Sequence, residues 1–166
     1  MPLLTVSDLH IRTRTTPLVK GVSFTVEKGE TVALVGESGS GKTLSALAIM
    51  GLLAPELDVR AHKLELNGED LQTLRPRARR ALRGSVMAMV FQEPATALNP
   101  VLTCGYQVEE AFLIHSTLNR GERKRRVLDL FAKVKLPDPE RMYAAYPHEI
   151  SGGQRQRVMI AMALAH

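Results

Sequence analysis

The sequence predicts a mixed α/β domain to about residue 100 and a mainly helical part after it, on three observations. Short apolar runs bounded by turn residues, a pattern typical of strands, recur in the first part. Apolar residues at helical spacing dominate the second part. Within the first part, residues 36–43 are rich in glycine, follow an apolar run and precede a helical pattern. With 166 residues, the chain is long enough for one domain with a sizeable core.

Five segments of the first part are predicted as strands because they are apolar or alternate between apolar and polar residues: 3–11, 22–27, 31–35, 63–66 and 86–91. The third is short and apolar throughout, which is typical of a strand buried on both faces. Asn67-Gly68 predicts a tight turn after the fourth. Gln92 follows the end of the fifth.

Four apolar stripes predict helices. The first follows the glycine-rich segment and consists of Leu44, Leu47, Ala48, Gly51 and Leu52. Two more lie in the second part, made of Val108, Ala111, Phe112 and His115, and of Val127, Leu130, Phe131 and Val134. After the interruption by Pro137 and Pro139, a last helix begins at Ser151 and carries Val158, Ala161, Met162 and Ala165 on one face. Because this pattern reaches the last residues without a glycine cap or a proline stop, we expect a chain that is cut short.

The glycine-rich segment predicts a phosphate-binding loop made of Gly36, Glu37, Ser38, Gly39, Ser40, Gly41, Lys42 and Thr43. Its glycines allow backbone conformations that turn successive N–H groups inward, and the next helix adds the positive end of its dipole. Lys42 can reach the β- and γ-phosphates of a nucleotide, and Thr43 can offer a hydroxyl to Mg²⁺. The segment therefore predicts the binding of a nucleotide with Mg²⁺, and a glycine-rich turn without a ligand is the weaker interpretation.

A second candidate site is the start of the last helix, with Ser151, Gly152, Gly153 and Gln154. Taken alone, this is a serine N-cap followed by small residues. As chemistry, it presents a hydroxyl and bare backbone amides at a helix N-terminus, which suits an anion. A chain with two such sites either binds two anions or brings the second to the nucleotide of a partner. Gln92 is a further candidate, because its amide could ligate Mg²⁺ or hold an attacking water, although a lone glutamine after a strand is usually only surface.

On these residues, the chain resembles the ATP-binding subunits of ABC transporters from about residue 3 to its end. It is similar in particular to the oligopeptide/dipeptide/nickel importer group. The narrower resemblance rests on residues 91–100, Phe-Gln-Glu-Pro-Ala-Thr-Ala-Leu-Asn-Pro, and on residues 146–165, which begin Tyr-Pro-His-Glu-Ile and contain Ser-Gly-Gly-Gln. The phosphate loop itself is common to many ABC ATPases.

The resemblance implies the fold of an ABC-type P-loop NTPase: a β-rich part with a RecA-like core at 1–100, a helical subdomain at 101–150 and a signature helix at 151–166, with the core incomplete at the C-terminus. It implies that Gln92 touches Mg²⁺ or water and that the loop after it docks on a membrane subunit. Two such domains would pair head to tail, so that residues 151–154 of one close over the ATP held by Lys42 and Thr43 of the other. Hydrolysis would then switch the transporter between its inward- and outward-facing states.

The partners implied are therefore a second ABC ATPase domain, transmembrane permease subunits and, indirectly, a solute-binding protein. The implied location is peripheral, on the cytoplasmic side of the membrane. The sequence agrees: its N-terminus lacks the pattern of a secretion signal, no apolar run approaches the roughly 18 residues of a membrane helix, and the single Cys104 cannot form an internal disulfide.

The sequence departs from the family in two places. Family members usually carry an aromatic residue that stacks on adenine before the second strand, whereas Arg12, Thr13 and Arg14 stand in this region, and an arginine could stack instead. The family's Walker B strand, catalytic glutamate and switch histidine follow the signature helix, and this chain ends before them. We therefore expect the 166 residues to bind nucleotide without useful hydrolysis, and to expose apolar surface that makes them unstable or prone to aggregation.

Two other functions remain open from the sequence. A soluble ABC ATPase acting on nucleic acid or ribosomes could use two basic clusters, Arg75, Arg77, Arg79, Arg80 and Arg83, and Arg120, Arg123, Lys124, Arg125 and Arg126. These clusters are typical of a solvated helix surface, and the alternative is an electrostatic contact with anionic lipid headgroups or nucleic acid. Nucleic acid is the weaker partner because no aromatic residues are interleaved. The third function is a binding-only remnant, if His166 is the natural end.

Overall fold

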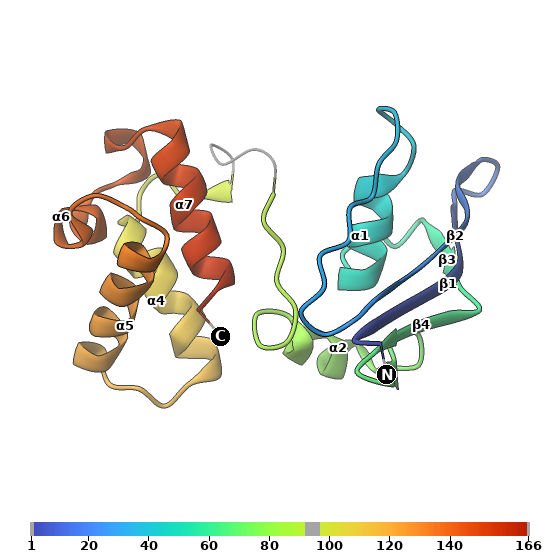
Figure 1. Ribbon diagram of the computed structural model, residues 1–166, viewed down its shortest axis with the longest axis horizontal. Helices are drawn as coiled ribbons and strands as arrows, with labels where there is room; N and C mark the ends of the chain where they lie inside the picture. Colours follow the sequence, from blue (N-terminus) through green and yellow to red (C-terminus); the bar gives the residue numbers. More distant parts are fainter. Residues whose placement is uncertain (1, 92–96, 166) are drawn as a thin grey trace. The chain divides into compact units, whose positions relative to one another are not determined.

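The computed structural model describes residues 2–91 and 97–165 (Figure 1). By its contacts, the chain divides into two compact units, Met1–Arg80 and Ala81–His166. The first unit contains the strands and the helix that follows the glycine-rich segment, and the second is helical. The division falls near residue 80, whereas the sequence pattern changes from strands to helices at about residue 100.

The first unit is built on an antiparallel sheet with the strands β1 (Leu4–Arg12), β2 (Pro17–Val26), β3 (Asp58–Arg60), β4 (Lys63–Leu66) and β5 (Glu69–Asp70). Strand β1 is central: it pairs with β2 on one side and with β4 and β3 on the other. Strand β5 pairs with the other edge of β4. The predicted strands at 3–11, 22–27 and 63–66 are confirmed, and the turn after β4 has Asn67 and Gly68 at φ 52° and 80°. The short strands β3 and β5 were not predicted.

A bulge in β1 decides which of its side chains enter the core. Strict alternation would bury Val6 together with Asp8 and His10, yet Val6, Leu9 and Ile11 are the buried residues. The register shifts between Val6 and Leu9, where Asp8 takes the left-handed conformation with φ 52°. Aspartate tolerates this conformation better than most residues, so the bulge moves Leu9 and Ile11 to the core face.

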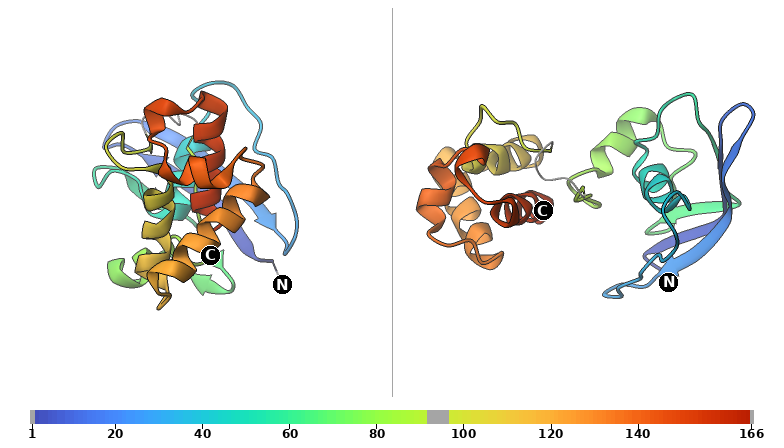
Figure 2. Two further views of the ribbon diagram at one scale, coloured as in Figure 1. Left: turned by 90° about the vertical axis from the view of Figure 1, so that its left-hand side faces the viewer. Right: turned by 90° about the horizontal axis from the view of Figure 1, so that it is seen from above.

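Helix α1 (Lys42–Met50) lies over one face of this sheet, and α2 (Pro76–Leu82) follows the last strand (Figures 1 and 2). The left-handed Gly41 and Gly51 bound α1 at its two ends. Its buried residues are Ser45, Ala48 and Met50, so the predicted stripe is right for Ala48. Leu52 is exposed, because the helix has ended before it.

Two predicted strands are not formed. Residues 31–35 and 86–91 have no strand pairing, apart from an isolated bridge between Arg83 and Met87. Most of their apolar side chains are exposed, up to 93% for Val35, whereas Met87 and Met89 are half-buried. The prediction of strands is therefore wrong for both segments, and so is the predicted burial of residues 31–35. An extended segment becomes a strand only when another strand pairs with its backbone groups, and no described strand does so.

The second unit consists of α4 (Cys104–His115), α5 (Arg120–Lys133), α6 (Pro139–Ala144), the 3₁₀ turn η1 (Pro147–Glu149) and α7 (Gly152–Ala163). All three predicted stripes of this part are apolar core: Val108 and Phe112 of α4, Val127, Leu130 and Phe131 of α5, and Val158 and Ala161 of α7 are buried. The side chain of His115 lies outside the described residues. Helix α6 was not predicted, although Pro139 suits its first turn.

Within the described residues, no helix is long and apolar enough to cross a bilayer.

Candidate functional site

The glycine-rich segment forms a tight loop that ends at the start of α1. Its turn is closed by the Ser40 N–H, which donates to the Glu37 carbonyl at 3.2 Å. Gly39 and Gly41 have φ of 82° and 89°, a region that favours glycine. At Gly41 space also matters, since a Cβ there would lie 2.6 Å from Val19 Cγ2 of β2. The loop is thus fixed by backbone conformation and by its close approach to the sheet.

Lys42 is folded back into this loop. Its ammonium Nζ donates to the carbonyls of Gly36 and Glu37, both at 2.7 Å, and to Ser40 Oγ at 3.2 Å. An ammonium has three donors, and all three are used here. The loop therefore holds a compact positive charge next to its own backbone.

The start of α1 supplies the second element of the site. Ser45 donates its hydroxyl to the Gly41 carbonyl at 3.0 Å, alongside its own N–H at 2.8 Å, and so ties the first turn together. Thr43 is exposed in this turn, and its hydroxyl has no hydrogen-bond partner in the described part of the chain. The helix leaves free N–H groups at this end, which add to the attraction for an anion.

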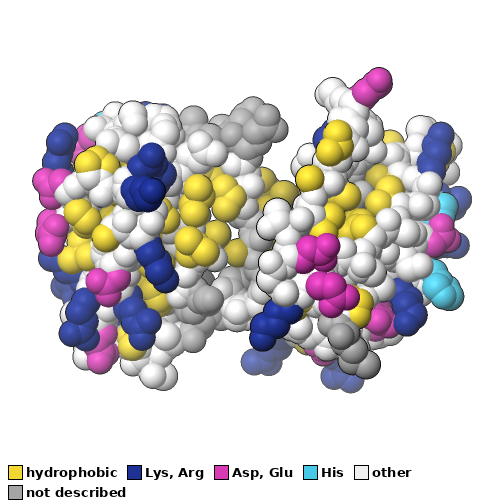
Figure 3. All heavy atoms as spheres, viewed as in Figure 1, with side chains coloured by type: hydrophobic (Ala, Val, Ile, Leu, Met, Phe, Trp, Pro, Cys, Tyr) yellow, Lys and Arg dark blue, Asp and Glu magenta, His cyan; other side chains and the backbone are white. Residues whose placement is uncertain are grey.

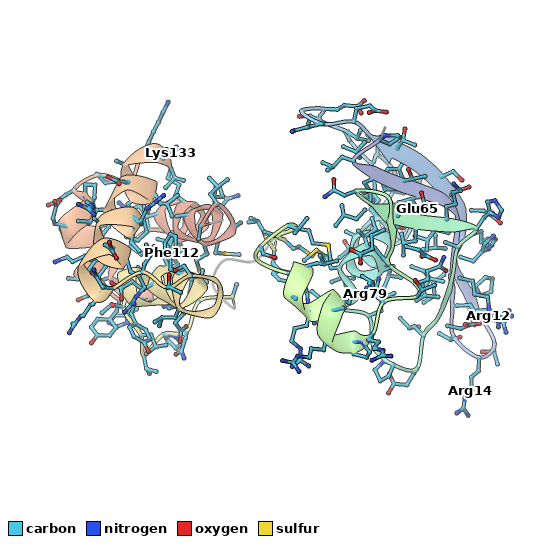
Figure 4. All side chains as sticks on the ribbon, turned by 90° about the horizontal axis from the view of Figure 1, so that it is seen from below. Arg12, Arg14, Glu65, Arg79, Phe112 and Lys133 are labelled. Atoms are coloured by element: carbon cyan, nitrogen blue, oxygen red, sulfur yellow. The ribbon has the colours of Figure 1, made fainter. Side chains whose placement is uncertain are left out.

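The far end of α1 is held by a residue that sequence reasoning missed. Arg79 Nη2 of α2 donates to the Ala48 carbonyl at 2.6 Å and to the Ile49 carbonyl at 3.3 Å (Figure 4). A Cβ at Gly51 would lie 2.6 Å from Arg79 Nε. Arg79 belongs to a cluster interpreted from the sequence as solvated surface, and that interpretation is wrong for this member. Nothing in the sequence signals a contact between residues so far apart.

The candidate serine–glycine site lies in the second unit, at the start of α7. Ser151 Oγ accepts the N–H of Gln154 at 3.3 Å, and Gln154 Oε1 accepts the N–H of Ser151 at 2.8 Å, which is a capping box. The N–H groups of Gly152 and Gly153 remain without a partner among the described residues, and both residues are exposed. The N-cap that the sequence predicted is confirmed.

The two glycines of this turn have no structural requirement in the described chain. A Cβ on Gly152 or Gly153 would meet no atom within 4 Å, and neither residue has a positive φ. Glycine costs a helix about 1 kcal/mol relative to alanine at interior positions. Packing within the unit therefore does not explain these glycines, whereas the close approach of another molecule would.

Three contacts lie in residues 146–155, just before the glycine turn and in the first turn of α7. Arg155 Nε donates to the Pro147 carbonyl at 2.7 Å, and the rings of Tyr146 and His148 stack with centroids 5.6 Å apart. Glu149 closes the preceding turn by accepting the N–H of Tyr146 at 2.8 Å. Residues 146–155 are therefore held together by contacts of their own next to the glycine turn.

The remaining candidates are placed differently. Gln92 lies outside the described residues. Arg12 is on strand β1, where its Nε is 3.3 Å from Asp58 Oδ2, and Arg14 is in the turn between β1 and β2 (Figure 4). Arg14 and its neighbours line a hollow of about 450 Å³ that also includes Pro55, Glu56 and Leu57. The phosphate loop belongs to the first unit and the glycine turn of α7 to the second.

Known proteins resemble the chain in sequence. The model of the ABC transporter family matches residues 19–166. The dipeptide transport ATP-binding protein DppD of Escherichia coli is 48% identical over 169 residues, covering 99% of this chain and 52% of that protein. DppD of Bacillus subtilis is 43% identical, with 98% and 50% covered. The peptidoglycan transport ATP-binding protein YejF of Agrobacterium fabrum is 48% identical, with 99% and 31% covered. The chain thus spans about half the length of its curated dipeptide-transport relatives.

Solved structures resemble it in fold. A bacterial ABC transporter cassette solved as a dimer matches with a TM-score of 0.83 and 26% identity, covering 98% of this chain and 69% of the cassette. A post-hydrolysis state of an ATP-binding cassette, bound to ADP and Pi, matches with a TM-score of 0.78 and 25% identity, with 98% and 69% covered. From its loop geometry, its matched family model and these likenesses, the chain belongs to the ABC transporter family and has the fold of an ATP-binding cassette.

Proposed function

We propose that the chain binds Mg-ATP at residues 36–43, as part of the ATP-binding subunit of an importer for peptides or related small solutes. The observation that carries this proposal is the position of Lys42, whose ammonium is held inside the loop by two carbonyls and a hydroxyl. The family match and the ADP-bound cassette of similar fold support the choice of an adenine nucleotide.

In this proposal, a phosphate enters the loop and replaces at least one of the three acceptors of the Lys42 ammonium, because all three of its N–H donors are in use. The N–H groups at the start of α1 bind the phosphate oxygens. The exposed Thr43 hydroxyl becomes a ligand of Mg²⁺, with Gln92 as a further ligand. When bound, Mg²⁺ neutralises part of the phosphate charge.

The glycine turn of α7 acts, in this proposal, on a nucleotide held by a second ABC ATPase domain. Its N–H groups at Gly152 and Gly153 are exposed, and the missing side chains leave room for phosphate to approach the backbone. A cassette of similar fold has been solved as a dimer, which supports a paired arrangement. The capping box keeps the turn rigid before the partner arrives.

The transport role rests on the relatives. DppD and YejF are described as transport ATP-binding proteins for dipeptide and peptidoglycan, so we propose a peptide or a related solute as cargo. A permease subunit, and indirectly a solute-binding protein, would complete the importer. The segment proposed to touch the permease begins at Gln92 and lies partly outside the described residues.

Calorimetric titration with Mg-ATP tests the nucleotide site through Lys42→Ala. We expect ATP binding to be lost, because the loop then has no cation facing the β- and γ-phosphates. Lys63→Ala is the matched control: it removes the same charge from an exposed position on β4, 3.5 Å from Glu65 Oε1, and should leave the affinity unchanged. Unchanged affinity in Lys42→Ala would refute the site.

The glycine turn is tested with Gly153→Asp. A carboxylate in the first turn of α7 interacts favourably with the positive end of the helix dipole, and the space around Gly153 is open. The helix should therefore be at least as stable as before. The same carboxylate repels a partner's phosphate. We therefore expect unchanged ATP affinity but loss of ATP-dependent pairing in sedimentation experiments. Pairing that survives the substitution would contradict a role for this turn.

A further inference from the structure

Helix α5 concentrates the positive charge of the chain. It carries six cationic side chains and two acidic ones, a net charge of +4, while the whole chain has a net charge of +5. Five of the cations lie in its first two turns, Arg120, Arg123, Lys124, Arg125 and Arg126, which we call the basic end of α5. In Figure 3, dark blue side chains lie over the lower part of the helical unit, where α5 begins in Figure 1.

This charge has little compensation within the described chain. The cations of the first unit that make ion pairs do so with neighbouring carboxylates, as Arg12 and Arg60 do with Asp58. Among the described residues, no cation of α5 makes an ion pair. The acidic residue nearest in sequence, Glu122, is engaged by its capping box with the N–H of Asn119 at 2.8 Å.

The placement of these cations is partly unfavourable for the helix. A helix N-terminus carries partial positive charge, so cations in the first turn of α5, Arg120 and Arg123, are unfavourable there. Arg120 and Lys124, four residues apart, and Arg123 and Arg126, three apart, also repel each other. Glu122 and Asp129 stand three or four residues from Arg125 and Arg126 and offset part of this repulsion, and an anionic partner outside the described chain would offset more of it.

Two of the five cations have a role inside the unit. Arg123 is part-buried and donates from Nη1 to the Leu118 carbonyl at 2.6 Å, and Lys124 Nζ lies 5.2 Å from the centre of the Tyr143 ring. Arg120, Arg125 and Arg126 are exposed, and their side chains have no hydrogen-bond or ion-pair partner among the described residues. At 100° per residue they point to different sides of the helix, so they surround its exposed end rather than one stripe.

We propose that the basic end of α5 binds the anionic headgroups of a lipid bilayer surface. Cations that surround a protruding helix end suit a plane of negative charge, and each contributes to attraction near such a surface. Single-stranded nucleic acid is favoured where exposed aromatic rings stack on bases, and the one aromatic residue of α5, Phe131, is fully buried. The choice of a membrane rests on the proposed function, because the ATP-binding subunit of an importer works beside a bilayer.

The test is binding of the 166-residue chain to vesicles of equal parts phosphatidylglycerol and phosphatidylcholine, measured by sedimentation of the vesicles. We expect binding that weakens with salt and is absent with phosphatidylcholine alone. The variant Arg120→Gln, Arg125→Gln, Arg126→Gln should bind on the order of a hundredfold more weakly. It spares the two cations that have partners inside the unit, and its Mg-ATP affinity should not change.

The matched control removes the same charge from the other basic cluster, with Arg75→Gln, Arg77→Gln and Arg80→Gln, all exposed positions around α2. This control should bind vesicles like the original chain.

An equal loss of vesicle binding in both variants would mean that net charge alone attracts the protein, and it would overturn the proposal. Unchanged vesicle binding in the α5 variant would also overturn it. Tighter binding to an RNA oligonucleotide than to vesicles, lost in the α5 variant, would overturn it in favour of nucleic acid. Because ATP affinity is measured separately, failure here leaves the nucleotide site to be judged by Lys42→Ala.

Discussion

Arg12 and Arg14 occupy the region where family members usually have an adenine-stacking aromatic residue, and their surroundings differ. The guanidinium of Arg12 is engaged at Nε by Asp58 on the neighbouring strand β3. Arg14 lies in the turn between β1 and β2, lines a hollow, and has no side-chain partner among the described residues. Of the two, Arg14 is therefore the better candidate to stack on a nucleotide base.

Arg14→Ala should weaken ATP binding about two- to fivefold, the size expected when an exposed cation–π contact is lost. Arg12→Ala is the matched control and should have a smaller effect, because its side chain is turned to Asp58. Titration with both ATP and GTP shows whether the contact distinguishes the bases. If neither change weakens either nucleotide, arginine stacking is wrong.

Tyr143 provides a prediction about alkaline pH in the helical unit. Burial raises the pKa of Tyr143 from 10.0 to about 12, together with the hydrogen bond that its hydroxyl donates to the Glu109 carboxylate. Since the folded state keeps the proton more tightly than the unfolded state, this contribution to stability is complete below pH 10 and is lost as the pH rises towards 12. The free energy of unfolding should therefore fall less steeply across this range in Tyr143→Phe.

Urea unfolding at several alkaline pH values measures this slope. The matched control is Tyr106→Phe, an exposed tyrosine of α4, which should keep the original slope. Burial also raises the pKa of the Cys104 thiol to about 11, but this group titrates alike in all three proteins. Equal slopes in Tyr143→Phe and the original chain would contradict the raised pKa of Tyr143.

At the scale of elements, α1 is fixed at both ends by different means. Its start is determined by the loop, where Gly41 can take a left-handed conformation beside Val19. Its end is determined by Gly51 and by Arg79, which reaches over from α2. Because Lys42 and Thr43 stand on the first turn of α1, the anchor at its far end also sets their position.

Arg79→Ala should lower the free energy of unfolding by about 1.5–3 kcal/mol, since a charged donor to two backbone carbonyls is lost. Arg77→Ala, at an exposed position of the same helix, should change it by less than about 0.5 kcal/mol. Denaturant unfolding measures both, and hydrogen exchange of the α1 amides should show the loss locally. Equal effects of the two changes would mean that Arg79 contributes only as a surface charge.

Elements formed by local rules were predictable, and elements that need a distant partner were predictable only in part. The serine N-cap of α7 and the turn after β4 depend on residues within four positions of each other, and both are present as expected. The residues at 31–35 and 86–91 have the composition of strands, yet their pairing depends on another strand. The bulge at Asp8 also escaped prediction, because alternation assumes an unbroken register.

At the scale of the whole molecule, these unpaired apolar segments contain half of the large hydrophobic residues that are exposed in the described chain. Val35 is 93% exposed and Phe91 46%, and hydrophobic side chains are visible on both units in Figure 3. Exposed apolar patches mark binding surfaces or sites of aggregation. This agrees with the expectation from the sequence that the 166 residues by themselves are prone to aggregation, which stays a prediction.

The chain should bind the dye ANS at neutral pH, and Val35→Thr together with Phe91→Ser should reduce its fluorescence. The melting temperature should stay unchanged, since these side chains are largely exposed and contribute little to packing. Val101→Thr, at an exposed position outside both segments, is the control and should change the fluorescence less. A lower melting temperature in the double variant would mean that the segments are buried in solution.

The sequence by itself determined the parts of this protein that follow from neighbouring residues. The glycines before Lys42 predict a loop, Ser151 caps a helix, and the stripes of α4, α5 and α7 define a core. Only the tertiary structure decided that Arg79 anchors α1, that the bulge at Asp8 redirects β1, and that two apolar segments remain unpaired. The physical reason is the range of the interactions: caps, turns and helical stripes are fixed within a few residues, whereas anchors and strand pairs depend on which distant segments the fold brings together.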